Sequence, residues 1–259
     1  MSTTSSYAPA PAAAPLHRMI RAQALLEARL LLRNGEQLLL AVAIPLLVLV
    51  GGERAGTLID LGELRRIDVL TPGVIALAVL STAFTSVAIS TGFERRYGVL
   101  KRLAATPLPR SGLLLGKVGA VQLVLAGQLT LISATAALLG WAPSADVWAV
   151  LSALALVVTG TAAFGALALA LAGVLRAEAT LAAANLVYLL LLVGGGVLVP
   201  LDRYPAAASA HLALLPSGAL AEGLREALTG AGTGGSHLPV LAGWTLLGAA
   251  VVARTFRWD

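Results

Sequence analysis

Long apolar runs separated by short polar segments dominate this chain of 259 residues. A transmembrane helix needs roughly 20 consecutive residues that are mostly apolar. Six runs approach or exceed that length, and they predict spans at about 36–52, 69–92, 113–139, 147–175, 179–200 and 237–253. The pattern therefore predicts an all-α integral membrane protein, with one membrane domain extending from residue 16 to residue 259.

Composition supports the same class. Hydrophobic residues make up 58% of the chain and charged residues 12%, whereas soluble domains carry about 25% charged residues. So little charge leaves an apolar surface that suits lipid. The chain has no cysteine, and its three histidines (His17, His211 and His237) lack the spacing of metal ligands. We therefore expect neither a disulfide nor a metal site.

The basic residues predict an orientation. With the N-terminus inside, 13 of the 18 Lys and Arg residues lie in inner segments and 5 in outer segments, as the positive-inside rule requires. Both termini and the segment between the second and third spans are then cytoplasmic. Basic residues placed between apolar spans suit a membrane surface, so nucleic acid is not an expected partner.

Three regions outside the spans differ in character. Residues 1–15 are rich in Ser, Thr, Ala and Pro and predict a disordered tail. Residues 16–34 predict an amphipathic helix lying in the inner interface, with four arginines within about a third of its circumference: Arg18, Arg21, Arg29 and Arg33. Residues 201–235 predict a short outer helix or a re-entrant element that begins near Pro216, although a plain surface loop is the alternative.

The most informative stretch is FERRYGVLKRLAATPLPRSGLLLGK, residues 93–117. Phe93, Tyr97 and Leu100 recur at helical spacing among charged residues, which predicts a short charged helix at the inner membrane surface. The sequence Thr106-Pro107 ends that helix, because proline cannot continue it.

The same stretch resembles the coupling loop of the type-2 ABC (ATP-binding cassette) exporter permeases. The matching pattern consists of Glu94, Arg95, Gly98, Leu103, Thr106 and Pro107, followed by Gly116 and Lys117. The arginine-rich helix before Pro45 and the Leu215-Pro216 element also resemble parts of that family, so the likeness extends over most of the chain. Gly35 departs from the family, in which proline often follows the Arg-Asn pair.

This resemblance implies a non-catalytic permease half that pairs with a second, identical or different half and with two cytoplasmic ATPase subunits. Those subunits would bind the ATP and Mg, and the surface helix around Glu94 to Leu103 would dock into them. The residues of the pattern from Glu94 to Pro107 would then couple the permease to the ATPase. The chain itself has no phosphate-binding loop, because residues 112–117 have the wrong glycine spacing and Val118 replaces the required Ser or Thr. We therefore expect no cofactor in this chain.

The cargo is predicted from the spans, which contain almost no charge. Such spans suit a hydrophobic or amphipathic cargo, such as a drug, an antibiotic or a lipid, exported across a bacterial plasma membrane. Candidate polar groups on its path are Gln122, Gln128 and Asn185, whose alternative role is hydrogen bonding between helices. Two other functions stay open: an ion-coupled transporter and a membrane-embedded lipid-modifying enzyme.

Overall fold

The computed structural model describes residues 13–33, 35–55, 65–143 and 146–255, without the side chains at 36–40, 104 and 110. All regular elements in these residues are helical. The longer single helices are α1 (Leu16–Arg33), α2 (Gly35–Arg54), α6 (Arg110–Leu138), α7 (Val147–Val174), α8 (Ala177–Gly194) and α11 (Leu238–Thr255). One continuous helix comprises α3 (Arg66–Val79), the π-helical η2 (Leu80–Ser86) and α4 (Val87–Arg96). The shorter elements are α5 (Val99–Ala104), η3 (Leu201–Arg203), α9 (Ala206–Leu212), α10 (Pro216–Thr229) and η4 (Gly235–His237).

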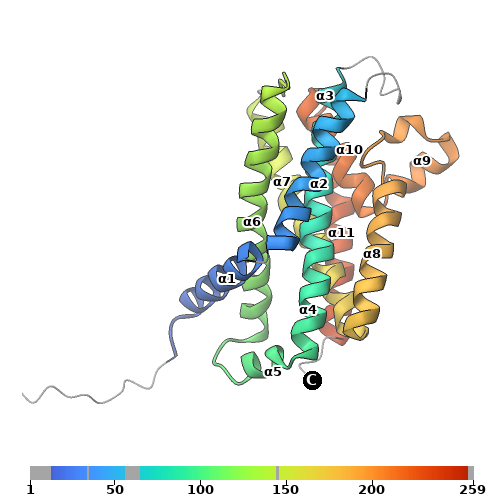
Figure 1. The fold of residues 1–259 in the computed structure, drawn as a ribbon. Helices are drawn as coiled ribbons and strands as arrows, with labels where there is room; N and C mark the ends of the chain where they lie inside the picture. The colour runs from blue at the N-terminus through green and yellow to red at the C-terminus, as the bar shows by residue number, and fades with distance from the viewer. Residues whose placement is uncertain (1–12, 34, 56–64, 144–145, 256–259) are drawn as a thin grey trace, which may run out of the picture.

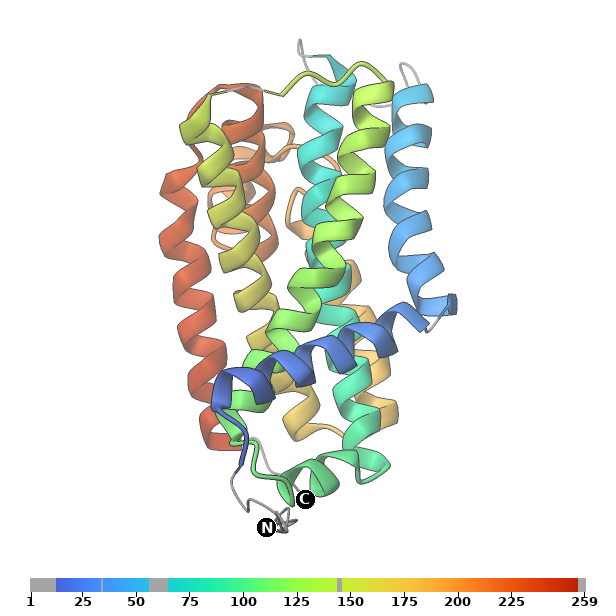
Figure 2. The same cartoon turned by 90° about the vertical axis from the view of Figure 1, so that its left-hand side faces the viewer.

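These helices form an elongated bundle with two distinct ends (Figures 1 and 2). We call them the α5 end and the α9 end after the short helix at each. Helix α1 crosses the bundle obliquely in the half nearer α5 and packs on α6. Helix α11 packs on α7, and α10 packs on α3 and α7.

Among the described residues, five helices are long and apolar enough to cross a membrane. They are Arg66–Arg96, Ser111–Leu138, Val147–Val174, Ala177–Gly194 and Gly235–Thr255, which correspond to the second to sixth predicted spans. The first predicted span corresponds to the 20-residue helix α2, which is not among the five. The chain is thus a helical protein with several membrane spans, and a crossing by α2 stays a prediction.

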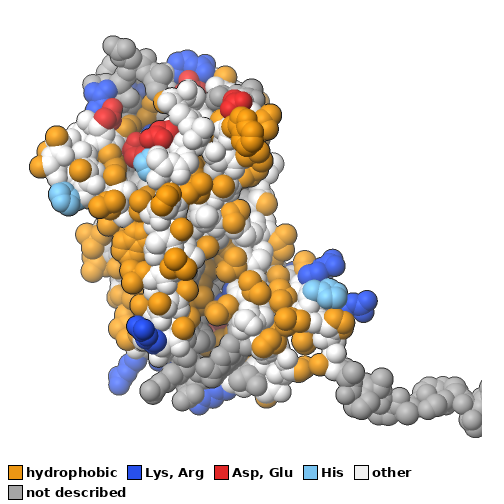
Figure 3. Space-filling model, turned by 180° about the vertical axis from the view of Figure 1, so that it is seen from behind, with side chains coloured by type: hydrophobic (Ala, Val, Ile, Leu, Met, Phe, Trp, Pro, Cys, Tyr) orange, Lys and Arg blue, Asp and Glu red, His pale blue; other side chains and the backbone are white. Residues whose placement is uncertain are grey.

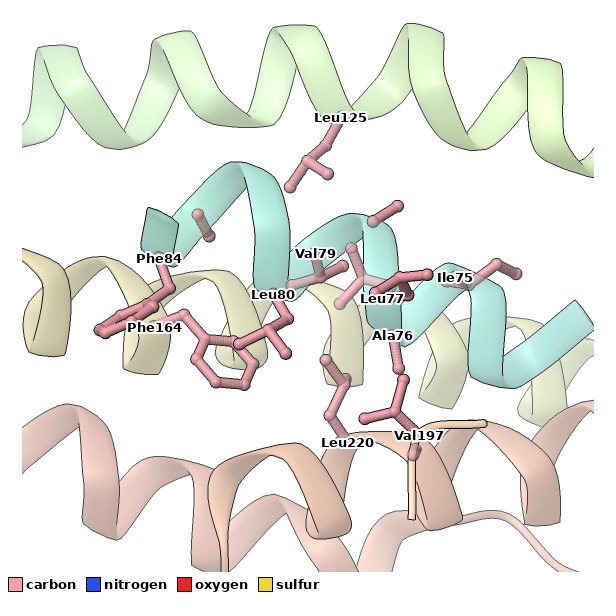
Figure 4. Close-up of a cluster of buried hydrophobic side chains, with 14 of the residues drawn as sticks. Ile75, Ala76, Leu77, Val79, Leu80, Phe84, Leu125, Phe164, Val197 and Leu220 are labelled. Atoms are coloured by element: carbon pink, nitrogen blue, oxygen red, sulfur yellow. The ribbon is translucent and has the colours of Figure 1, made fainter. Parts of the chain in front are cut away.

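The second span lies at the centre of the bundle. Its most apolar stretch is 78% buried, whereas the corresponding stretches of α8 and α11 are only 17% buried. Figure 4 shows Leu80 of this span in one cluster with Leu125 of α6, Phe164 of α7 and Leu220 of α10. Such close packing is how membrane helices associate, because lipid offers no hydrophobic driving force between them.

The outer helices point large apolar side chains away from the bundle. Leu138, Val193 and Leu246 are 89%, 66% and 72% exposed. Figure 3 shows hydrophobic side chains spread over the middle of one face, with charged side chains at its upper and lower ends and on the projecting helix α1. A band of this kind suits contact with hydrocarbon.

A proline in α2 is compensated by a neighbouring helix. Pro45 has no N–H, so the carbonyl of Ala41 lacks its partner within the helix. The side-chain amide of Gln128, on α6, donates a hydrogen bond to this carbonyl. Its oxygen accepts one from the Thr82 hydroxyl in η2, at 2.9 Å. Gln128 is buried, and its two hydrogen bonds link α6 to α2 and η2. This is the interhelical role that the sequence offers as the alternative to cargo contact.

The fifth span is shorter than predicted. Helix α8 ends at Gly194 rather than near residue 200, and Gly196 follows with a φ of 61°, which favours glycine. A Cβ on Gly195 would lie 1.9 Å from the Ser217 Oγ atom, so only glycine fits against the start of α10. The segment after α8 contains α9 and α10, where the sequence predicts a short helix or a re-entrant element, with a plain loop as the alternative. Helix α10 is largely buried, so it returns into the bundle.

Candidate functional site

Segment 93–117 changes direction at Gly98. Helix α4 ends at Arg96, and Gly98 adopts a φ of 69° before α5 begins. No atom lies within 4 Å of a Cβ built on Gly98, so this position needs glycine for its backbone conformation rather than for space. The single charged helix predicted here is thus divided, because Phe93 to Arg96 continue the second span and only Val99 to Ala104 form α5.

The far end of α5 is closed by Thr106. Its hydroxyl donates a hydrogen bond to the carbonyl of Leu103 at 2.6 Å. Thr106 and Pro107 are exposed, and Leu103 is half-buried. The three predicted residues therefore form the turn that returns the chain to α6.

Glu94 points into the bundle, where it meets Lys117. The Lys117 Nζ atom lies 2.9 and 2.7 Å from the two carboxylate oxygens of Glu94. It also lies 3.0 and 3.1 Å from the two oxygens of Glu27, on α1. Lys117 is only 4% exposed. We call Glu27, Glu94 and Lys117 the Lys117 triad; it joins α1, α4 and α6 and carries a formal charge of −1.

Helices α1 and α6 approach closely enough for this contact because α6 has small residues there. A Cβ on Gly116 would lie 2.7 Å from the Cγ atom of Gln23, and one on Gly119 would lie 3.2 Å from the Cβ atom of Ala24. The Gln23 amide donates to Glu27 at 2.9 Å. Beside the triad lies a cavity of about 150 Å³, whose other lining residues are Leu30, Leu31, Val87, Ser90, Ala120 and Val121.

Arg95 holds the same segment from another side. Its guanidinium Nη1 atom donates to the carbonyls of Ala172 and Gly173, at 2.8 and 2.6 Å. These carbonyls lie in the last turn of α7, where the helix leaves them without partners and where a positive charge is favourable. Arg96 forms an ion pair with Glu178 of α8, but both side chains are more than half exposed, so this pair contributes little.

On the outward side of α5, the side chains of Lys101 and Arg102 form no ion pair or hydrogen bond with other described residues. Leu100 is fully buried and fixes α5 to the bundle, whereas Tyr97 is 65% exposed. Val99, Lys101 and Arg102 are also exposed. One basic and partly aromatic surface thus projects from the α5 end of the bundle, next to the turn at Thr106.

The other predicted residues lie apart from this site. The arginines of α1 are exposed, on the side opposite the residues that pack on α6 (Gln23, Ala24 and Ala28). Gln122 is half-buried in α6, and Asn185 is exposed on α8. The structure does not bring Gln122, Gln128 and Asn185 into one described pocket. Among the described residues, no three His, Cys, Asp or Glu side chains are placed to hold a metal ion.

A second buried charge lies at Arg225 in α10, which the sequence places among the outer basic residues and in the helical element that follows Leu215-Pro216. Its Nη1 atom lies 2.6 Å from Glu222, and its Nη2 atom donates to the carbonyl of Val197 at 2.7 Å. Glu222 also accepts a hydrogen bond from the Leu201 N–H, at 3.0 Å. Burial lowers the pKa of the Arg225 guanidinium, and the Glu222 carboxylate acts in the opposite direction. The pair supplies hydrogen bonds to the non-helical backbone after α8.

The fold and this geometry define a class, namely helical membrane proteins with a short charged helix fixed at one end of the bundle. The family model for the ABC-2 type transporter matches residues 23–229, from within α1 to the end of α10, and the chain belongs to that family. Members are generally non-catalytic membrane subunits that work with ABC ATPase subunits. No curated protein matches the chain.

Proposed function

We propose that the chain is the permease half of an ABC exporter and that α5 docks into a separate ATPase subunit. The observation that carries this proposal is the exposed surface at α5, formed by Tyr97 in the turn before it and by Val99, Lys101 and Arg102. The side chains of Glu94 and Arg95 instead bind α6 and the last turn of α7. We call residues 93–109 the coupling segment.

Within this proposal, Glu94 and Arg95 do not meet the ATPase themselves. They fasten the coupling segment to α6 and to the end of α7, so that a push on α5 moves the long helices. A rigid connection of this kind converts a displacement at the surface into a change of helix packing. Gly98 supplies the turn that aims α5 at the ATPase.

The α5 end is the cytoplasmic end in this proposal, and both termini lie on that side. The basis is the distribution of 13 inner and 5 outer basic residues. A cysteine introduced by Ala105→Cys, an exposed position, tests it in this cysteine-free chain. An impermeant thiol reagent should label it only in opened cells, and labelling in intact cells would contradict the topology.

A second permease half completes the transporter, as a homodimer or a heterodimer. Helix α8 supports this, because Asn185 is exposed among the exposed apolar side chains of Leu186, Leu189 and Leu190. An amide facing hydrocarbon has no hydrogen-bond partner, whereas a neighbouring helix offers one. The cargo is hydrophobic or amphipathic and leaves across a bacterial plasma membrane, along a path that includes Gln122 and Asn185.

The decisive experiment uses the chain co-expressed with its natural ATPase subunit and reconstituted in vesicles. Lys101→Glu combined with Arg102→Glu should release the ATPase and abolish ATP-driven export, because it reverses the charge of the docking face. Arg254→Glu, an exposed arginine at the end of α11, is the matched control and should keep both. Export at the parental rate by the α5 variant would refute docking through this face.

Ion-coupled transport is the second candidate, because the Lys117 triad places three ionisable groups inside the bundle. Such groups commonly mark ion or proton pathways in membrane proteins. Vesicles that contain the chain without any ATPase separate the two functions. Cargo accumulation driven by an imposed ion gradient would favour this candidate, and accumulation only with ATPase and ATP would favour the exporter.

A further inference from the structure

Lys117 lies where helices α1, α4 and α6 meet. Helix α6 carries Lys117 itself, α4 contributes Glu94, and α1 contributes Glu27. Both carboxylates lie within 3.1 Å of the single ammonium group. The oblique helix α1 is therefore linked through one buried side chain to the helix that leads into the coupling segment.

A buried ion cluster of this kind contributes geometry more than stability. Removing the ions from water costs about as much as their mutual attraction returns, and apolar residues of similar size often replace such clusters without loss of stability. One ammonium group that satisfies two carboxylates does, however, define a single arrangement of the helices that carry them. The triad therefore restricts how α1, α4 and α6 lie relative to one another.

This restriction on how α1, α4 and α6 lie also affects the position of α5. Glu94 lies two residues before the end of α4, and the turn at Gly98 and α5 follow at once. We propose that Lys117 is a positioning residue which, through Glu94 and Glu27, makes α1 and the coupling segment move as one body during transport. This inference rests on the proposed function, because the movement in question is the one that the docked ATPase transmits to α5.

The first test replaces the whole triad by methionine, in the variant Glu27→Met, Glu94→Met, Lys117→Met. No unpaired charge remains buried, although the Gln23 amide loses its acceptor, so the thermal unfolding midpoint should change little and the yield with the ATPase subunit should equal the parental value. Export per ATP hydrolysed should fall about fivefold or more, the usual size of a lost coupling between sites. Glu226→Met, which removes the partner of His237 near the α9 end, is the control and should keep the parental ratio.

The second test isolates the contact with α1. Glu27→Met alone leaves the Lys117–Glu94 pair intact and should also lower export per ATP. Cysteines introduced by Ala24→Cys and Gly119→Cys are close to disulfide range, since their Cβ atoms would lie 3.2 Å apart and disulfides have about 3.5–4.5 Å. Oxidation should restore the ratio in the Glu27→Met background, and it should leave a parental background unchanged.

The same cysteines give a measurement that needs no ATPase. In the chain alone in lipid, their disulfide should form about fivefold more slowly with Glu27→Met than without it, because α1 then leaves α6 for part of the time. Equal rates, a parental export ratio in the triple variant, or failure of the disulfide to restore export would overturn the inference. A parental complex without ATP-driven export would refute the proposed function instead, while the disulfide rates still decide whether Glu27 positions α1.

Discussion

The α5 end and the α9 end of the bundle each contain a cluster of buried charges, and the two clusters are arranged differently. At the α5 end, Lys117 meets carboxylates from two other helices, so the contacts join side chain to side chain. At the α9 end, Arg225 meets Glu222 of its own helix, and their remaining bonds go to the backbone of Val197 and Leu201.

This difference separates two uses of buried charge in a membrane. The backbone after α8 leaves its helix inside the bundle, and polar groups there need partners that lipid does not supply. The Arg225 pair supplies them and so makes an irregular backbone tolerable. Around Lys117 the backbone is helical and already satisfied, which leaves the relative placement of helices as the effect of the charges. We expect loss of the Arg225–Glu222 pair to affect folding, and loss of the whole Lys117 triad to affect coupling.

Lys117→Met alone should have the largest effect on stability, because it removes one charge of the triad and leaves the others. Two carboxylates that are only 12% and 21% exposed lose their cation, and breaking a buried ion pair from one side costs about 3–5 kcal/mol. Thermal unfolding in lipid nanodiscs should show this loss, while the triple methionine variant unfolds close to the parental temperature. A triple variant as unstable as Lys117→Met would mean that the charges stabilise the fold, and the comparison of the two ends would fail.

Arg225→Met should have the next largest effect. It removes the donor to the Val197 carbonyl and the partner of Glu222, but it leaves one carboxylate instead of two without a cation, and Glu222 still accepts the Leu201 N–H. The loss should be about 2–3 kcal/mol, typical for hydrogen bonds to charged groups. The same unfolding measurement checks it. In contrast to the α5 end, removal of both partners by Glu222→Met with Arg225→Met should not restore stability, because the backbone groups remain unsatisfied.

Much of the fold could be predicted from the sequence because the long spans depend on local signals. Helices α6 and α7 begin and end within three residues of the predicted limits, since apolar runs there stop at prolines and polar residues. Asp146 begins α7, accepting a hydrogen bond from the Ala149 N–H. The end of α8 was not located in this way, because the apolar run continues to Pro200. The helix ends at the Gly194-Gly195-Gly196 run, where Gly195 packs against Ser217 and Gly196 adopts a positive φ.

The candidate site was predictable only in part. The residues of the coupling segment were found through a resemblance, but the direction in which Glu94 and Arg95 point depends on partners far along the chain, at Lys117 and Gly173. Glu27 was missed altogether. A signal for it existed, because Glu27 is an acidic residue on the face of α1 opposite the arginines. That face packs on α6, where an acidic group requires a cation.

A substitution at Gly98 should have a smaller effect, and one that is unrelated to buried charge. Gly98→Ala forces an L-residue into the left-handed region, at a cost of about 1–2 kcal/mol, and Gly98→Asn should cost less because asparagine tolerates that region. A Cβ at this position has no atom within 4 Å. If the backbone conformation at residue 98 determines export, the Gly98→Asn variant should export more cargo per ATP than the Gly98→Ala variant. The reverse order would mean that the ATPase needs the empty space at Gly98.

The smallest effect is expected at Gln128, which lies between the two ends. Gln128→Leu removes the donor to the Ala41 carbonyl, which Pro45 leaves unpaired, and the acceptor of the Thr82 hydroxyl. Interhelical hydrogen bonds in membranes contribute about 1 kcal/mol or less each, so the unfolding midpoint should fall only slightly. Gln122→Leu is the matched control on the same helix, since no hydrogen bond of the Gln122 side chain is found among the described residues, and it should leave the midpoint unchanged. Pro45→Ala restores the missing N–H to the Ala41 carbonyl, so Gln128→Leu should cost less in that background than in the parent. An equal loss in both backgrounds would show that the link to Thr82, rather than the carbonyl freed by Pro45, accounts for the contribution of Gln128.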